Sequence, residues 1–174
     1  MIWNKKYFLN AWLIFFMQAC SILYTFSGIS LSKDIRTFSV EECFCSVSLA
    51  PSGLEEKFSE EVVLAILQRT QLNHKTSEPG DIQFYIEIVK FDYSPVAVSA
   101  SSEDAVGDST RLTINIKVTY VNNADENAGF KNKEISQYQD MSSDLNIDTE
   151  QPRLIGDVFK KLIDDLLKDS VCNW

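Results

Sequence analysis

The chain has 174 residues, 45% of them hydrophobic, and a formal net charge of −9 at pH 7. This length and composition fit one globular domain and exclude a collagen-like, coiled-coil or largely disordered chain. So acidic a chain is a poor general ligand for nucleic acid, because phosphate neutralisation needs clustered Lys and Arg. We therefore expect no nucleic-acid partner.

The N-terminal segment has the order of a secretory signal peptide. Lys5 and Lys6 precede an apolar run, Ala11–Met17, and the small residue Ala19 stands directly before Cys20. A basic, then apolar, then small sequence is typical of signal-peptidase cleavage, and a cysteine after the cut is typical of a lipoprotein. We expect residues 1–19 to be removed and Cys20 to carry a covalent lipid that holds the protein on a bilayer.

An uncleaved membrane anchor is the alternative for this segment. Tyr7–Phe26 contains no charged residue and is 20 residues long. That length is enough to span a hydrocarbon core of about 30 Å. Met17 and Gln18 also differ from the residues that are commonest before a lipoprotein cysteine. The segment Tyr7–Phe26 is interrupted by four polar residues, Asn10, Gln18, Ser21 and Thr25, which favours the cleaved lipoprotein.

The first part of the mature chain leads from the anchor into the domain. We expect residues 20–34 to be anchor and tether, and residues 35–174 to form a single domain. Ile35–Val40 is predicted to be a strand, because apolar residues alternate there. Cys43–Gly53 is predicted to be a loop, because a proline and a glycine break regular structure.

A helix is predicted over Leu54–Arg69. Its apolar residues recur at helical spacing, and its acids lie toward the N-terminus, where the helix dipole favours them. A short strand over Leu72–Lys75 and a turn over Glu78–Asp81 follow.

The middle of the chain is predicted to be β-structure. Ile82–Val89 alternates, and Tyr93–Val96 is expected to end or bend this strand, because proline cannot donate to a ladder. Ser99–Ser109 reads as an exposed loop. Arg111–Tyr120 has the clearest alternation, as in an antiparallel sheet with one wet face, and Phe130–Asp140 returns as its edge partner.

The last element is predicted to be a long amphipathic helix. Two apolar ridges run along it, Leu154, Val158, Leu162, Leu166 and Ile155, Phe159, Ile163, Leu167. Charged residues fill the opposite side, so the helix should lie on a sheet. The expected fold class is α+β, with two helices packed on one face of a roughly four-stranded mixed or antiparallel sheet.

We expect neither an enzyme nor a metal site. The sequence has no nucleophile-elbow, phosphate-loop or zinc-protease motif. Beyond Cys20, three cysteines remain, Cys43, Cys45 and Cys172, so at least one is free or pairs between chains. A bridge to Cys172 and a zinc site with His74 are the alternatives, but the Cys-x-Cys spacing fits zinc poorly.

Several short segments together resemble the LptE family of lipopolysaccharide-assembly lipoproteins in its short-chain form. They follow the expected anchor in the family's order and spacing: Phe26–Gly28, Gly80–Phe84, Tyr93–Ala97, Arg111–Ile114 and Asn173–Trp174. Cys43–Cys45 departs from the family, which usually has a turn with Asn or Pro at that point.

The resemblance implies an outer-membrane lipoprotein with no catalytic role and no cofactor other than the lipid on Cys20. Members of the family plug the LptD-type β-barrel translocon, assist its assembly and contact lipopolysaccharide on its way to the outer leaflet. The resemblance therefore implies three partners, the barrel, lipopolysaccharide and outer-membrane lipid. It also implies a domain on the periplasmic side and in the barrel lumen. An unrelated outer-membrane or surface lipoprotein acting as a binding module is the alternative function.

Lipopolysaccharide phosphates suit Lys and Arg side chains. The ordered candidates for this contact are Arg111, Lys117, Lys131 and Lys133. If Tyr120 pairs with Phe130, all four lie on the sheet face away from the core and form one basic patch. We prefer this register, because it also places Tyr138 beside Leu112 in the core.

A slip of one residue is the alternative register. If Val121 takes the place of Tyr120 in that pairing, Lys117 faces Glu134 and Arg111 faces Asp140. The opposite charges then neutralise one another, and Lys131 and Lys133 turn to the other face of the sheet.

Overall fold

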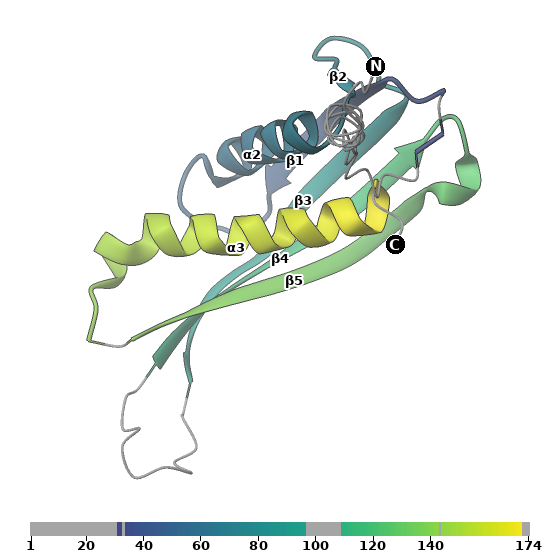
Figure 1. The fold of residues 1–174 in the computed structure, drawn as a ribbon. Coiled ribbons are helices and arrows are strands. Elements are labelled where there is room, and N and C mark those ends of the chain that lie inside the picture. Colours follow the sequence, from purple (N-terminus) through teal and green to yellow (C-terminus); the bar gives the residue numbers. More distant parts are fainter. Residues whose placement is uncertain (1–30, 33, 97–108, 143, 172–174) are drawn as a thin grey trace, which may run out of the picture.

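Alternating apolar residues build a five-stranded sheet, and two α-helices lie on one of its faces (Figure 1). The computed structural model describes residues 31–32, 34–96, 109–142 and 144–171. Its elements in chain order are β1 (Thr37–Cys45), α2 (Leu54–Arg69), β2 (Asn73–His74), β3 (Ile82–Val96), β4 (Ser109–Asn122), the 3-10 turn η1 (Glu126–Ala128), β5 (Phe130–Ser142) and α3 (Ile147–Ser170).

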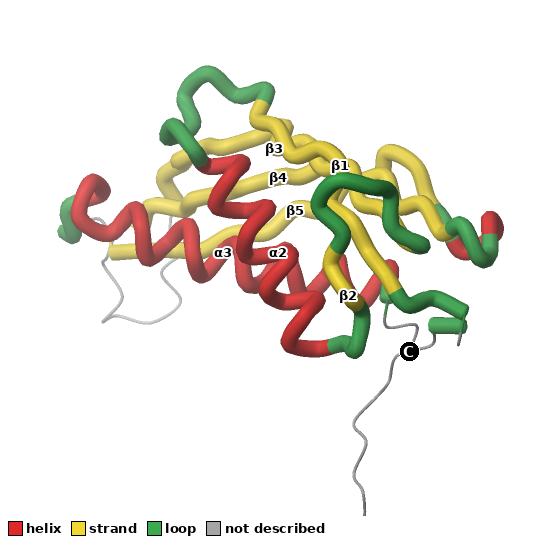
Figure 2. Tube along the Cα trace, turned by 90° about the horizontal axis from the view of Figure 1, so that it is seen from above, coloured by secondary structure: helices red, strands yellow, loops and turns green. Residues whose placement is uncertain are grey.

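The sheet is mixed, with the strand order β2-β1-β3-β4-β5. β1 pairs in parallel with both β2 and β3, whereas β3 with β4 and β4 with β5 are antiparallel. The expected α+β class is confirmed, with five strands rather than roughly four because the short β2 adds to the edge. Figure 2 shows both helices on the same side of the strands.

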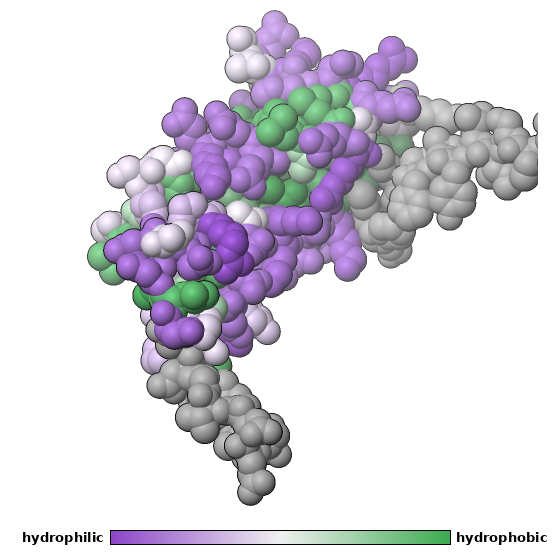
Figure 3. Space-filling model, turned by 60° about the vertical axis from the view of Figure 1, so that its left-hand side comes forward, coloured by the Kyte–Doolittle hydropathy of each residue, from purple (hydrophilic) through white to green (hydrophobic). Residues whose placement is uncertain are grey.

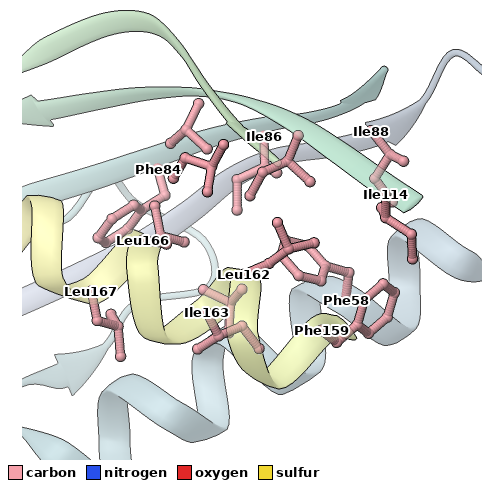
Figure 4. Packing of buried hydrophobic residues seen from close by; sticks show 14 of the residues in the cluster. Phe58, Phe84, Ile86, Ile88, Ile114, Phe159, Leu162, Ile163, Leu166 and Leu167 are labelled. Carbon is pink, nitrogen blue, oxygen red and sulfur yellow. The ribbon is translucent and has the colours of Figure 1, made fainter. Parts of the chain in front are cut away.

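The core lies between the helices and the sheet. The two ridges of α3 are fully or almost fully buried, as are the alternate residues of β4 from Leu112 to Tyr120. Phe58 of α2 meets Phe159 of α3 edge to face, with ring centroids 4.7 Å apart. Figure 4 shows side chains from both helices and from β3 pointing into this one core. The predicted helix on a sheet is confirmed.

β1 is longer than the sequence suggests. We expected a loop from Cys43, but Cys43–Cys45 continues β1 by pairing with Ile86–Ile88 of β3. A bulge between Val40 and Glu42 precedes this stretch. No breaker residue occurs before Pro51, so nothing in the chain opposes the extension. The predicted loop start was wrong, and the segment that departs from the family pattern is part of a strand.

β3 includes Pro95 and ends at Val96, within the stretch where an end or a bend was expected. Pro95 pairs with Thr110 of β4, whereas the pairing with β1 has already ended opposite Ile88. Among the described residues, β3 therefore has one neighbouring strand at this point, and the side of Pro95 that lacks an N–H can face away from that strand. β3 ends one residue later, at Val96, so the prediction that Tyr93–Val96 ends this strand is confirmed.

The topology gives the domain two distinct ends. At the proximal end lie the start of β1, β2, the turn between β4 and β5, and the C-termini of both helices (Figure 1). At the distal end lie the end of β3, the start of β4, the end of β5 and the N-terminus of α3, whereas β1 ends opposite Ile88 of β3. The chain enters β1 at the proximal end.

Candidate functional site

The two cations of β4 lie on the open face of the sheet, the face away from both helices. Buried residues alternate with half-buried ones along β4, and Arg111 and Lys117 belong to the half-buried set. Because side chains point alternately to the two faces of a strand, these cations lie opposite to the core. Their expected placement is confirmed.

The pairing of β4 with β5 changes register near the turn. Tyr120 pairs with Phe130, which is the pairing that we preferred. A shift follows at once, however, and Lys117 then lies opposite Glu134, as in the alternative register. That register holds to the end of the two strands, so our preference was wrong for most of the hairpin.

A bulge on β5 causes the shift. Asn132 has a φ of 51°, in the left-handed region that asparagine tolerates better than most residues. Its backbone N–H donates to Oγ1 of Thr119 at 3.2 Å, which fills the gap in the ladder. An extra residue moves the following side chains to the other face, and Lys133 thus lies opposite Val118 on the helix side.

Arg111 is fully engaged by its neighbours on β5. Its Nε and Nη2 donate to Oδ1 and Oδ2 of Asp140 at 2.6 and 2.8 Å. Its guanidinium also lies 3.8 Å from the ring centroid of Tyr138. The hydrogen bonds from Arg111 lower the pKa of Asp140 below its usual range. Tyr138 is 47% exposed and pairs with Thr113, so its expected place in the core was wrong.

The other candidates are divided between the two faces. On the open face, Nζ of Lys117 lies 3.7 Å from Oε2 of Glu87. On the helix side, Nζ of Lys133 lies 2.9 Å from Oδ2 of Asp169 in α3. Lys131 is exposed, and within the described residues no acidic group lies at ion-pair distance from it.

The single basic patch expected from the sequence is therefore wrong. Three of its four cations have acidic partners, and one of these lies on the helix side. Exposed ion pairs contribute only about 0–1 kcal/mol, so a strong anionic ligand can compete for the same cations. Contact of these four residues with lipopolysaccharide stays a prediction.

The Gly80–Asp81 motif joins the start of β3 to the start of β1. Oδ2 of Asp81 accepts three hydrogen bonds of 2.9 Å, from the backbone N–H groups of Arg36 and Thr37 and from the Thr37 hydroxyl. A Cβ at Gly80 would lie 2.6 Å from the backbone of Phe38. The motif therefore fixes the parallel pairing of the two strands, which is a structural role.

The two described cysteines, Cys43 and Cys45, are free thiols on β1. Sγ of Cys43 donates to the carbonyl oxygen of Glu55 at 3.2 Å, and burial raises the pKa of Cys43 to about 12. A thiol with so high a pKa stays protonated and unreactive at neutral pH. The bridge to Cys172 that we considered lies outside the described residues.

The predicted anchor also lies outside the described residues. The described residues begin at residue 31, so they do not include the expected signal peptide, Cys20 or most of the expected tether. In the ranges that are described, no helix has both the length and the hydrophobicity needed to cross a membrane. Within the same ranges, no three His, Cys, Asp or Glu side chains are grouped so that they could bind a metal ion.

The fold defines an α+β domain of one mixed sheet and two helices. Several solved structures align with parts of the chain at low sequence identity. The hypothetical protein CT253 from Chlamydia trachomatis aligns with a TM-score of 0.49 and 12% identity, over 80% of this chain and 99% of that one. Rare lipoprotein B from Shewanella oneidensis aligns with a TM-score of 0.41 and 10% identity, over 75% of this chain and 89% of that one. A minor lipoprotein from Acinetobacter baumannii aligns with a TM-score of 0.43 and 8% identity, over 77% of this chain and 91% of that one. No curated protein matches the sequence.

A family model decides the membership of the chain. The model of LptE, described as lipopolysaccharide-assembly, matches residues 43–170, which run from the end of β1 to the end of α3. The chain belongs to the LptE family. It is thus a cell-envelope lipoprotein of lipopolysaccharide assembly, as the sequence resemblance implied.

Proposed function

We propose that this lipoprotein plugs an LptD-type β-barrel in the outer membrane, assists its assembly, and helps to deliver lipopolysaccharide to the outer leaflet. The observation that carries the proposal is the family match over residues 43–170, which covers both helices and nearly the whole sheet. We propose a binding role without catalysis, on the periplasmic side and in the barrel lumen.

The open face of the sheet supports this proposal. A large outer-membrane barrel has a polar, wet interior, and a plug needs a surface that suits it. Cations of the open face pair with acids of the same face, as Arg111 does with Asp140 and Lys117 with Glu87. Such a face is polar yet locally neutral, so it can approach a barrel wall without a large desolvation penalty for unpaired charge.

Co-purification tests the function. A tagged full chain, extracted from outer membranes, should bring down one large β-barrel protein in a one-to-one ratio. An unrelated outer-membrane lipoprotein with the same tag is the control and should not. Recovery without a barrel, together with cleavage by protease on intact cells, would favour the surface binding module instead, because a plug is shielded.

The lipid anchor has its own test. We propose that Cys20 is acylated after removal of residues 1–19, so labelled palmitate should appear on the wild-type chain. The Cys20→Ala variant should lose the label, whereas Cys43→Ala should keep it, because Cys43 lies within the domain. Label on the Cys20→Ala chain would overturn the assignment of the anchor.

For the lipopolysaccharide contact we propose Lys131 as the principal cation among Arg111, Lys117, Lys131 and Lys133. It is exposed and has no acidic partner among the described residues, so its charge is available to a phosphate. Lys131→Glu should weaken lipopolysaccharide binding by the purified complex more than Lys117→Glu does. Equal affinity of wild type and the Lys131→Glu variant would remove this residue from the site.

A further inference from the structure

We propose that the open edge of β1, from Val40 to Cys45, is a docking site for an extended basic segment of the barrel partner, which adds to the sheet as a further strand. This inference rests on the proposed function, because it needs the barrel complex. It concerns the Cys43–Cys45 stretch, which the family resemblance did not explain.

The backbone of β1 is uncovered over this stretch. β2 pairs only with Thr37 and Phe38. The last backbone contact on that side is the hydrogen bond of 2.9 Å from the Lys75 N–H to the Phe38 carbonyl. Among the described residues, no strand lies outside β1 beyond this point. An uncovered strand edge presents unpaired N–H and C=O groups, which an extended peptide can satisfy.

The opposite edge of the sheet is closed to such pairing. β5 has the bulge at Asn132, which interrupts a regular edge. Farther along, Nζ of Lys161 donates to the Tyr138 carbonyl at 2.8 Å and to Oε1 of Gln139 at 2.9 Å. A helix side chain thus occupies a carbonyl of the edge strand. No such contact is described for β1 between Val40 and Cys45.

Apolar side chains lie exposed beside the open edge. Phe44 points to the open face of the sheet and is 47% exposed, and Leu49 in the following loop is 88% exposed. On the side of the molecule that Figure 3 presents, hydrophobic groups interrupt a mostly hydrophilic surface. Exposed apolar side chains next to a free strand edge are suitable anchors for a partner's alternate side chains.

The charges of the edge select a basic occupant. Glu41 and Glu42 are both exposed, and in the described part of the chain no cation lies at ion-pair distance from either. The Ser39 hydroxyl donates to Glu41, but neither acid has a cation beside it among the described residues. Such acids attract Lys or Arg on an approaching segment and repel phosphates, so this edge differs from a lipopolysaccharide site. They also oppose pairing with the same edge of a second copy, because like charges would then meet.

The two longer stretches of residues 20–174 outside the described residues do not suit this edge. The stretches outside the described residues with enough length are 20–30 and 97–108, and neither contains Lys or Arg. Residues 97–108 contain three acids, which the glutamates of the edge would repel. A partner protein is the source that we propose for the basic strand, and the barrel is that partner.

Hydrogen exchange on the purified complex tests the inference. Backbone amides of residues 40–45 should exchange at least tenfold more slowly in the barrel complex than in the isolated full lipoprotein, while those of residues 130–136 on β5 should not change. A stable complex with unchanged exchange in β1 would overturn the inference and leave the proposed function intact. If the wild-type chain forms no complex at all, the proposed function fails and the inference fails with it.

Charge reversal supplies a second, independent test. Replacing Glu41 and Glu42 together by Lys should raise the dissociation constant of the complex by roughly tenfold, through lost attraction and added repulsion. Glu60→Lys, on the exposed face of α2, is the matched control and should have little effect. Equal affinities of the double variant and the control, with both folded by circular dichroism, would contradict a basic occupant.

Discussion

Asp81, at the start of β3, and Thr37, at the start of β1, form two hydrogen bonds with each other across this parallel pair of strands. The Thr37 hydroxyl donates to Oδ2 of Asp81 at 2.9 Å, and the Asp81 N–H donates back to Oγ1 of Thr37 at 3.0 Å. The backbone N–H groups of Arg36 and Thr37 donate to the same carboxylate oxygen. Because four hydrogen bonds meet at two side chains, the start of β3 is fixed against the start of β1.

Asp81→Asn should destabilise the domain by about 1–3 kcal/mol, because hydrogen bonds to a charged acceptor are stronger than those to an amide. Urea unfolding at pH 7 measures this. Asp144→Asn is the matched control, since Asp144 is exposed and has no described hydrogen bond or ion pair. Equal loss of stability in the two variants would contradict the role given to Asp81.

The same carboxylate should give the stability a dependence on pH. Hydrogen bonds from Arg36 and Thr37 lower the pKa of Asp81 in the folded state. A lowered folded pKa stabilises the protein above the unfolded pKa of about 3.9, and this contribution is lost as pH falls through the folded value. The stability gap between wild type and Asp81→Asn should therefore be full at pH 7 and narrow below about pH 4. A gap that stays constant down to pH 2 would refute this linkage.

Gly80→Ala should destabilise the domain by about 1–3 kcal/mol, the usual cost of overpacking. The added Cβ would lie 2.6 Å from the backbone of Phe38, and the backbone of β1 cannot move without loss of its pairing. Gly156→Ala in α3 is the control, because a Cβ there meets nothing within 4 Å and alanine favours a helix. The thermal unfolding temperature should thus fall for Gly80→Ala and rise for Gly156→Ala. An unchanged unfolding temperature for Gly80→Ala would show that β1 and β3 are less tightly apposed.

Asn132→Val should destabilise the hairpin by about 1–2 kcal/mol, because a β-branched residue rarely adopts a φ of 51°. Asn132→Gly should be tolerated, since glycine adopts that conformation freely. Both variants can be compared by chemical denaturation. If valine is accepted as readily as glycine, the bulge is absent and the register of β4 with β5 needs revision.

Leu162→Ala should cost about 2–5 kcal/mol, because it leaves a cavity in the core between α3 and the sheet. Leu64→Ala on α2 removes the same atoms from a residue that is 54% exposed, and it should change stability by no more than about 0.5 kcal/mol. Denaturant midpoints give the comparison. Similar losses of stability in both variants would mean that the faces of α2 and α3 assigned here to the core and to the surface are wrong.

Local patterns predicted most of the fold. The helix over Leu54–Arg69 has the bounds that its spacing indicated, and the alternation of Arg111–Tyr120 identified the buried face of β4. Both depend on residues a few positions apart. The extension of β1 to Cys45 was missed, because it depends on pairing with β3 about forty residues later in the chain.

The candidate site was harder to predict, because it depends on one backbone conformation and on partners from distant elements. Asn132 takes a left-handed conformation, and this single residue turns Lys133 to the helix side. There it meets Asp169 of α3, whose position no local pattern relates to β5. An asparagine between two lysines in an edge strand was the one available sign of a bulge.

Depletion of the protein in its own cells tests the central claim most directly, with surface lipopolysaccharide as the measured quantity. If the chain serves lipopolysaccharide assembly at an outer-membrane barrel, its depletion should lower lipopolysaccharide on the outer leaflet while the molecule accumulates inside the envelope. Expression of the wild-type chain should restore the surface level. Unchanged lipopolysaccharide on the surface of fully depleted cells would contradict the account.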